Sequence, residues 1–203
     1  MSRVQLGWVL SVLTLLTSGL ALAGSAAWVG AEGNEAPGAP PAFRSITAGD
    51  LHTCALLSDH TVKCWGFNAS GQLGLGDTAS RGDANGEMGG SLPVVDLGTD
   101  RTATALSAND GHTCALLDTG SVKCWGRNTS GELGLGDRVN RGDDAGEMGD
   151  DLLPVDLGAD RTATAIAVGE VHTCAILDDG TVKCWGGNSK GQLGLGDREN
   201  RGD

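Results

Sequence analysis

The feature that most constrains the fold is a cassette that recurs with a spacing of sixty residues. Each copy begins with His-Thr-Cys and ends with Cys-Trp-Gly, and the three copies run over residues 52–66, 112–126 and 172–186. All six cysteines of the 203-residue chain lie in these cassettes. A fixed period of this length marks a repeat architecture, in which each unit buries little apolar surface alone and much more when it stacks on its neighbours.

Each period contains short strand-like segments separated by Gly- and Asp-rich turns. In the second copy there are four of them, at residues 102–106, 112–117, 121–126 and 152–157, and no helical period is sustained over ten residues. Four antiparallel strands in a repeat of this length predict an all-β fold built from blades of the β-propeller type. We expect three repeats, over residues 43–101, 102–161 and 162–203, the last one incomplete. Because closed propellers have about four to eight blades, the three should form an open or truncated propeller.

The recurring residues also carry a resemblance to a known family. Each copy reads His-Thr-Cys-Ala, a turn, Val-Lys-Cys-Trp-Gly, and then Asn-x-x-Gly-Gln/Glu-Leu-Gly-Leu-Gly-Asp. This string resembles the regulator of chromosome condensation repeat, over about residues 43 to 203. The resemblance implies a β-propeller whose blades act mostly in protein interaction; the namesake is a nucleotide exchange factor for a small nuclear GTPase. The chain departs from the family in having three repeats, where familiar members have about seven, and in its cassette cysteines.

The N-terminal segment has the composition of an export signal. Arg3 is followed by an apolar stretch from Leu6 to Leu16, and Ala21-Leu22-Ala23 supplies a small-residue cleavage pattern. This order predicts a secretory signal peptide over residues 1–23, and hence a secreted protein, extracellular or periplasmic. The alternative is a retained membrane anchor. Residues 24–42 are rich in Ala, Gly and Pro and are expected to be a linker.

The two cysteines of each cassette flank a short turn. In the second copy, a three-residue loop ending in Gly120 suits a type I turn with a G1 bulge, which places Cys114 directly opposite Cys124. His60 takes the place of the bulge glycine in the first copy, so it should adopt a left-handed conformation. Close cross-strand spacing, export and an even cysteine count favour disulfides. The predicted pairs are Cys54–Cys64, Cys114–Cys124 and Cys174–Cys184.

Two other uses of the cassette residues compete with disulfides. A zinc site would combine both cysteines with the cassette histidine, such as His112, but structural zinc takes four ligands and each cassette offers three. A Cys–His nucleophile pair would need free thiols, which an oxidising compartment removes. The repeated Trp65, Trp125 and Trp185 are expected to pack between blades.

The long loops after the cassettes carry two further patterns. Arg-Gly-Asp occurs at residues 81–83, 141–143 and 201–203, and we interpret it as part of a larger repeated loop string, with receptor adhesion as the alternative. The same loops collect carboxylates, and Asp137, Asp143 and Glu147 are the calcium-ligand candidates. A solvated acidic loop is the competing interpretation.

Charge and motif content narrow the function. A net charge of −12 disfavours nucleic-acid binding, which depends on Lys and Arg neutralising phosphates. The chain has no nucleophile elbow, phosphate loop or metalloprotease motif. The sequence therefore predicts a non-catalytic, exported repeat protein without a cofactor, acting as a scaffold for a protein or glycan partner.

Alternatives to this function remain. The resemblance implies a guanine-nucleotide exchange factor-like regulator of a small GTPase, and the acidic loops suggest a calcium-linked surface or adhesion module. The open ends of the blade stack allow self-association, and membrane contact is expected only if the N-terminal segment is kept as an anchor.

Overall fold

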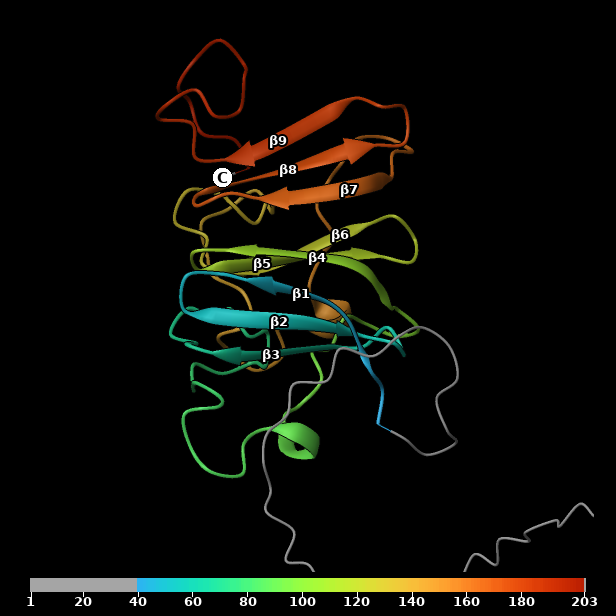
Figure 1. Cartoon of the computed structure of the whole chain (residues 1–203). Helices are drawn as coiled ribbons and strands as arrows, with labels where there is room; N and C mark the ends of the chain where they lie inside the picture. Colours follow the sequence, from blue (N-terminus) through green and yellow to red (C-terminus); the bar gives the residue numbers. More distant parts are fainter. Residues whose placement is uncertain (1–39, 203) are drawn as a thin grey trace, which may run out of the picture.

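The computed structural model describes residues 40–202, which form three antiparallel sheets of three strands each (Figure 1). The sheets comprise β1 (Phe43–Ala48), β2 (His52–Leu57) and β3 (Val62–Gly66); β4 (Ala103–Asn109), β5 (His112–Leu117) and β6 (Val122–Gly126); and β7 (Ala163–Val168), β8 (His172–Leu177) and β9 (Val182–Gly186). The strands pair in chain order, and the second sheet lies between the other two (Figure 1). The predicted all-β class, with three blade-like units, is confirmed.

The remaining parts of the chain contain little regular structure. Helical turns in residues 40–202 are limited to the 3₁₀ segments η1 (Gly89–Ser91) and η2 (Gly149–Asp151). No helix in that range is long and apolar enough to cross a bilayer. The predicted signal peptide, and all but the last three residues of the predicted linker, lie outside the described residues.

The structure corrects the predicted number of strands per repeat from four to three. Residues 92–97 and 152–157, the fourth predicted strands, form no strand. They still touch the sheets, because the Val95 N–H donates to the Val62 carbonyl and the Val155 N–H to the Val122 carbonyl, each with N···O 2.8 Å. Each segment contains a proline, which removes a backbone donor and prevents a continuous ladder.

The second hairpin of each sheet has the predicted turn. The Leu117 N–H donates to the Ser121 carbonyl and the Gly120 N–H to the Leu117 carbonyl, each over 2.9 Å. Gly120 is left-handed with φ 76°, and His60 adopts the same conformation with φ 66°, as predicted. This register sets Cys114 opposite Cys124, and the other two cassettes repeat it.

The cysteines form the three predicted disulfides. In each of the pairs Cys54–Cys64, Cys114–Cys124 and Cys174–Cys184 the Cα atoms are 4.1 Å apart. No thiol in the described part of the chain remains for a zinc site or a nucleophile. On the chain-entropy model each bridge stabilises the fold by about 2.8 kcal/mol, which matters for blades with few aromatic residues.

The apolar core lies between neighbouring sheets. The cluster between the first two sheets combines Cys54, Leu56, Val62, Cys64, Leu73, Val95 and Leu97 with Ala103, Ala115, Leu117, Trp125 and Leu152. An equivalent cluster lies between the second and third sheets and packs them together. Trp125 and Trp185 are buried there, and their indole N–H groups donate to the carbonyls of Gln72 (3.1 Å) and Glu132 (3.0 Å) in the preceding repeat. The predicted packing between repeats is confirmed for these two tryptophans.

A chain of buried polar groups also joins adjacent sheets. His52 Nε2 on β2 lies 2.8 Å from Thr113 Oγ1 on β5, and the Thr113 hydroxyl donates to the Gln72 carbonyl over 3.2 Å. A hydroxyl has one proton to donate, so Nε2 of His52 must be the donor to the threonine oxygen. His112, Thr173 and Glu132 repeat the arrangement between the next two sheets, at 3.0 Å for each contact.

These histidines are held in their neutral form. Nδ1 of His52 and of His112 is buried without a hydrogen-bond partner in the structure. At His112 a second proton placed there would be a buried, unpaired donor. At His52 the backbone of Asp110 offsets only part of the cost of burying the charged ring. Burial accordingly lowers the pKa of His52 to about 4 and that of His112 to about 3.

We expect the free energy of unfolding to fall as the pH is lowered from 6.5 to 4.5. The unfolded chain protonates these two histidines near pH 6.5, whereas the folded chain does so only near the lowered pKa values, so the unfolded state binds more protons throughout this window. The loss should be about 2 kcal/mol per histidine. Denaturant titrations at both pH values measure this loss of unfolding free energy. His112→Gln keeps an amide donor but does not titrate, so it should remove about half of the pH-dependent loss. Equal stability at both pH values would show that the histidines are not held neutral.

Candidate interaction surfaces

The predicted calcium ligands lie in one loop, where their oxygens bind protein donors. Asp137 Oδ2 accepts a hydrogen bond from Arg141 Nη2 over 2.6 Å. Glu147 Oε2 accepts from the backbone N–H groups of Gly142 (2.9 Å) and Asp144 (3.1 Å). Within residues 40–202, no group of three or more His, Cys, Asp or Glu side chains, including Asp143, is placed to hold a metal ion. These hydrogen bonds show that protein donors already bind oxygens of Asp137 and Glu147, and calcium binding by this loop stays a prediction.

The Arg-Gly-Asp tripeptides anchor the loops to the sheets. Arg141 pairs with Gly126 in an isolated β-bridge, and its guanidinium binds Asp137 and the Val139 carbonyl (2.9 Å). Gly142 has φ 87°, and a Cβ there would lie 2.8 Å from the Gly71 carbonyl oxygen of the preceding repeat. Glycine is therefore required for the loops of adjacent repeats to touch. These contacts support the loop-architecture interpretation over receptor adhesion.

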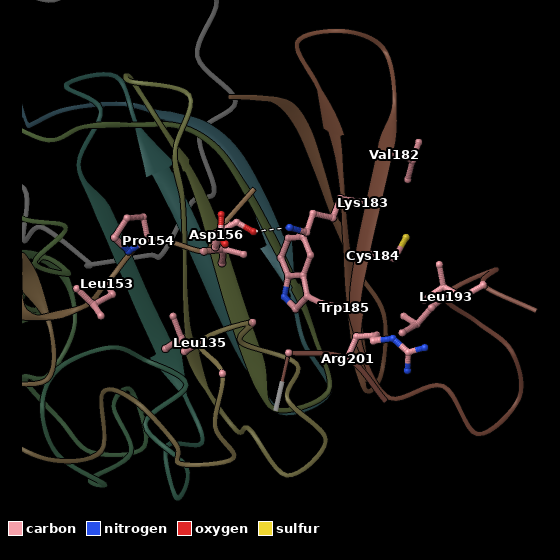
Figure 2. A pocket seen from close by; sticks show the side chains of 15 residues that line it. Leu135, Leu153, Pro154, Asp156, Val182, Lys183, Cys184, Trp185, Leu193 and Arg201 are labelled. Carbon is pink, nitrogen blue, oxygen red and sulfur yellow. Dashed lines mark hydrogen bonds between the residues drawn. The ribbon is translucent and has the colours of Figure 1, made fainter. Parts of the chain in front are cut away.

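A cavity of about 670 Å³ lies against the third sheet (Figure 2). Its walls come from β9, from the segment that follows η2, and from the loops after β6 and β9. The larger lining side chains are Leu135, Leu153, Pro154, Val155, Asp156, Val182, Lys183, Trp185, Leu193, Leu195 and Arg201. Lys183 Nζ donates to the Asp156 carbonyl over 2.7 Å at one wall (Figure 2). The rest of the lining is mainly apolar.

One edge of the stacked sheets differs from repeat to repeat. We call it the turn edge, and it consists of residues 49–51 and 67, 109–111 and 127, and 169–171 and 187. In every repeat its two parts are joined by one backbone bond, from residue 67 to 51, 127 to 111 and 187 to 171. The first of these positions is Phe, Arg or Gly and the second is Leu, Gly or Val, whereas the neighbouring His-Thr-Cys and Cys-Trp-Gly never change. Packing between the sheets fixes the constant residues and leaves the turn edge to vary.

A small groove on the turn edge combines apolar and charged side chains. It has a volume of about 110 Å³ and lies between the first two repeats, lined by Asp50, Leu51, Phe67, Ser70, Gln72, Asp110, Gly111 and Arg127. Leu51 is 61% exposed and Phe67 is 45% exposed. An exposed aromatic ring and a leucine beside an arginine resemble the anchors that dominate protein–protein interfaces.

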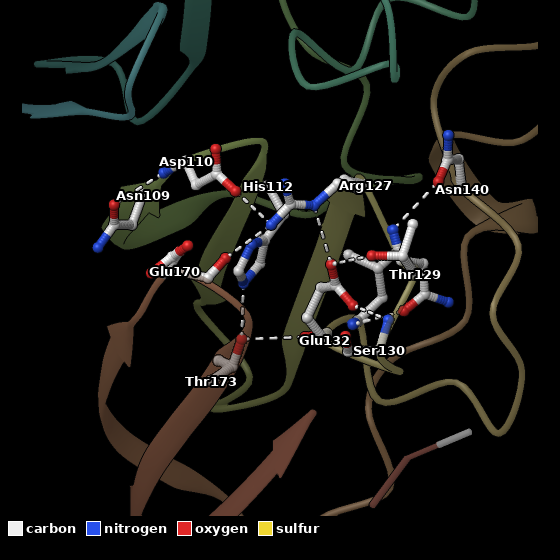
Figure 3. A network of polar contacts seen from close by, with 12 residues as sticks. Asn109, Asp110, His112, Arg127, Thr129, Ser130, Glu132, Asn140, Glu170 and Thr173 are labelled. Atoms are coloured by element: carbon white, nitrogen blue, oxygen red, sulfur yellow. Dashed lines mark hydrogen bonds and ion pairs between the residues drawn. The ribbon is translucent and has the colours of Figure 1, made fainter. Parts of the chain in front are cut away.

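Arg127 is held in place by a network that reaches into the protein (Figure 3). Its guanidinium pairs with Asp110 and with Glu132 (Nε···Oε1 3.2 Å), and it donates to the Glu170 carbonyl of the third repeat over 2.9 Å. Glu132 is fully buried and also accepts from the Ser130 N–H over 2.5 Å. The network therefore fixes a partly buried cation on the turn edge and ties two repeats together.

The partners of Glu132 explain why it differs between repeats. Gln72 and Gln192 occupy its position in the other two repeats, where Phe67 and Gly187 replace the arginine. A buried carboxylate requires a paired cation, whereas a buried amide does not. The carboxylate accordingly occurs in the repeat that supplies arginine.

Sequence reasoning missed Leu51, Phe67, Arg127 and Glu132. The signal that marks them is their variation within otherwise matching repeats. The residues that differ between the repeats, and not only those that recur, identify the turn edge.

The variants Arg127→Phe and Glu132→Gln test this coupling, since together they recreate the residue pair of the first repeat. Arg127→Phe alone leaves the Glu132 carboxylate buried without its cation, so we expect a loss of about 3 kcal/mol in the free energy of unfolding. The double variant should recover most of that loss. Chemical denaturation of the unaltered protein, the two single variants and the double variant measures the loss and its recovery. Additive effects of the two substitutions would contradict the coupling.

Comparison with known proteins places these repeats in a family. The model of the regulator of chromosome condensation (RCC1) repeat matches residues 43–72, 103–132 and 163–192, and a second model of the same repeat matches residues 119–176. Each of the three matched segments begins at the first strand of a sheet and ends beyond its third strand. The matches thus coincide with the structural repeats.

Relatives of known name share these repeats. The chain is 34% identical over 160 residues to the ultraviolet-B receptor UVR8 of Arabidopsis thaliana, covering 77% of this chain and 32% of the relative. It is 32% identical over 149 residues to Protein RCC1 of Candida albicans, covering 71% of this chain and 32% of the relative. The chain spans about a third of the length of these two relatives.

The solved structures agree in fold. Prp20p of Saccharomyces cerevisiae superposes with a TM-score of 0.59 at 23% identity, covering 79% of this chain and 37% of that structure. Family models, curated relatives and fold therefore point the same way, and the chain belongs to the regulator of chromosome condensation repeat family.

Proposed function

We propose that this chain is an exported, non-catalytic repeat protein that binds a partner protein through its turn edge. The observation that carries the proposal is the contrast between constant packing residues and the varied, exposed Leu51 and Phe67 beside Arg127. The strands act as a rigid support, and the edge residues supply the specificity. Binding sites on variable segments held by a fixed scaffold are common among repeat proteins.

The groove has the features that a protein partner would use. Phe67 and Leu51 offer apolar surface that is already ordered by the bond between their backbones. Asp110 and Arg127 lie beside them, and because the network of Glu132 holds Arg127 in position, little side-chain entropy is lost on binding. A glycan that stacks on Phe67 is the competing ligand class.

Two features support export. Residues 1–23 have the order of a secretory signal, and all six cysteines of the chain are paired in disulfides, which persist in oxidising compartments. Free cytosolic thiols would instead be kept reduced.

Guanine-nucleotide exchange on a small GTPase is the second candidate, and family membership is the observation that favours it. The structurally similar Prp20p has binding properties toward Gsp1p and histones. This chain matches 37% of Prp20p, and an exported protein would not meet a cytosolic GTPase. We therefore propose partner binding as the first candidate function and exchange activity as the second.

The double variant Leu51→Gly with Phe67→Gly tests the turn edge, since glycine is present at these positions in other repeats. We expect the amount of partner that is chemically crosslinked to the exported protein, in its own compartment, to fall at least about tenfold, because two apolar anchors are lost. Quantitative mass spectrometry of the crosslinked material measures the change.

N-terminal sequencing of the same protein should show that the chain begins after Ala23.

Val139→Gly provides the control, because Val139 is 58% exposed on a loop outside the turn edge. It should leave crosslinking unchanged. Equal recovery of the partner with both variants would rule out the turn edge as the binding surface, and an uncleaved cytosolic chain would rule out export.

A further inference from the structure

We propose that the chain carries two N-glycosylation acceptor sequences at which a glycan prevents folding, so that the protein folds in a compartment without N-glycosylation. The two sequences, of the form Asn-x-Ser, are Asn68-Ala69-Ser70 and Asn128-Thr129-Ser130. Each follows the third strand of its sheet. The consequence for the compartment rests on the export proposed above, whereas the conflict between glycan and fold does not.

The acceptor nitrogen of each sequence is bound inside the protein. Asn68 and Asn128 are both 0% exposed. Asn68 Nδ2 donates to the backbone carbonyls of Asp77 over 2.7 Å and Ala79 over 3.1 Å. Its Oδ1 accepts a hydrogen bond from the Leu73 N–H over 2.9 Å. These partners fix the orientation of the amide, because a carbonyl can accept only from the nitrogen end and an N–H can donate only to the oxygen end.

The other two repeats hold the equivalent asparagine in the same way. Asn128 Nδ2 donates to the carbonyls of Asp137 and Val139, each over 3.0 Å. Asn188 Nδ2 donates to the carbonyl of Asp197 over 3.1 Å. The asparagine therefore closes the same loop in every repeat, and its amide nitrogen belongs to the interior of that loop.

N-glycosylation uses the nitrogen that these hydrogen bonds occupy. In the transfer, Nδ2 bonds to the anomeric carbon of a sugar carried on a lipid pyrophosphate; the lipid pyrophosphate leaves, and Nδ2 gives up one of its two protons to solvent. The product has a single N–H, so Nδ2 can no longer donate to both carbonyls. The sugar would also have to fit where the loop backbone lies. A chain that carries the glycan therefore cannot close the loop.

The third repeat shows that the fold needs the asparagine but not the acceptor sequence. Residues 188–190 read Asn-Ser-Lys, with Lys190 at the position of Ser70 and Ser130. What this position contributes in all three repeats is its backbone N–H, which donates to the side-chain oxygen two residues later over 2.9, 2.5 and 2.7 Å. Ser70→Ala and Ser130→Ala keep this N–H, and together they remove both acceptor sequences.

The hairpin turn of the first repeat offers a matched position where a glycan should be tolerated. Asp59 is exposed, and its Oδ1 accepts hydrogen bonds from the Thr61 N–H over 3.0 Å and from the Thr61 hydroxyl over 2.7 Å. Asp59→Asn creates the acceptor sequence Asn-His-Thr and keeps an oxygen for both bonds. The new amide nitrogen then lies on the surface of the protein.

The test directs the full chain, behind an added secretion leader, into a eukaryotic secretory pathway that N-glycosylates. The unaltered chain is compared with the Ser70→Ala, Ser130→Ala double variant and with a triple variant that also carries Asp59→Asn. We expect at least about tenfold less secreted protein from the unaltered chain than from the double variant, because glycans deprive its loops of hydrogen bonds. The triple variant should match the double variant in yield and carry one glycan. Mass spectrometry before and after enzymatic removal of glycans measures yield and occupancy.

Equal secretion of the unaltered chain and the double variant overturns the proposal, as does folded, secreted protein with a glycan on Asn68 or Asn128. Poor secretion of the triple variant also overturns it, since the position of the glycan would then not matter. Equal thermal unfolding of the unaltered chain and the double variant, both made in a bacterial host without N-glycosylation, shows that the serine substitutions leave the fold intact. The added leader makes these results independent of residues 1–23, so they are separate from a failure of the proposed export.

Discussion

The stack depends on a buried hydrogen bond between a histidine of one sheet and a threonine of the next. A three-stranded sheet cannot bury both of its faces alone, so the contacts between sheets determine whether the fold exists. The Thr113 hydroxyl oxygen accepts a hydrogen bond from His52 Nε2, and the hydroxyl donates one to the Gln72 carbonyl. The same carbonyl accepts a second hydrogen bond from the Trp125 indole N–H. One carbonyl thus joins a loop of the first repeat to two strands of the second, and the next interface repeats the arrangement.

The contacts between sheets explain which residues of each repeat are constant and which vary. The histidine, threonine and tryptophan are fixed by the interface, and the cysteines are fixed by the hairpin they close. What remains free to change is the turn edge, where Phe67, Arg127 and Gly187 occupy one structural position. Arginine at that position is accompanied by the buried Glu132, so even the variable edge alters the core in a correlated way.

The parts of the fold that follow local rules could be predicted from sequence. Period-2 strands and turn chemistry predicted the pairing of Cys114 with Cys124 and the left-handed His60. The fourth strand was predicted wrongly, because an apolar pattern reports burial and not whether a proline interrupts the ladder, as Pro93 and Pro154 do. The groove was missed because Asp50 and Asp110, sixty residues apart, become neighbours only when the sheets stack.

The most direct test of this dependence compares Thr113→Val with Thr53→Val. The two threonines hold the same cassette position, but Thr113 is fully buried in the bond between sheets, whereas Thr53 lies on the first sheet, which has no preceding repeat in the described part of the chain. We predict that Thr113→Val lowers the free energy of unfolding by about 2 kcal/mol, because it leaves the Nε2 proton of His52 unpaired. Thr53→Val should change it by less than about 0.5 kcal/mol. Equal losses in the two variants would show that the histidine–threonine bond does not hold the sheets together.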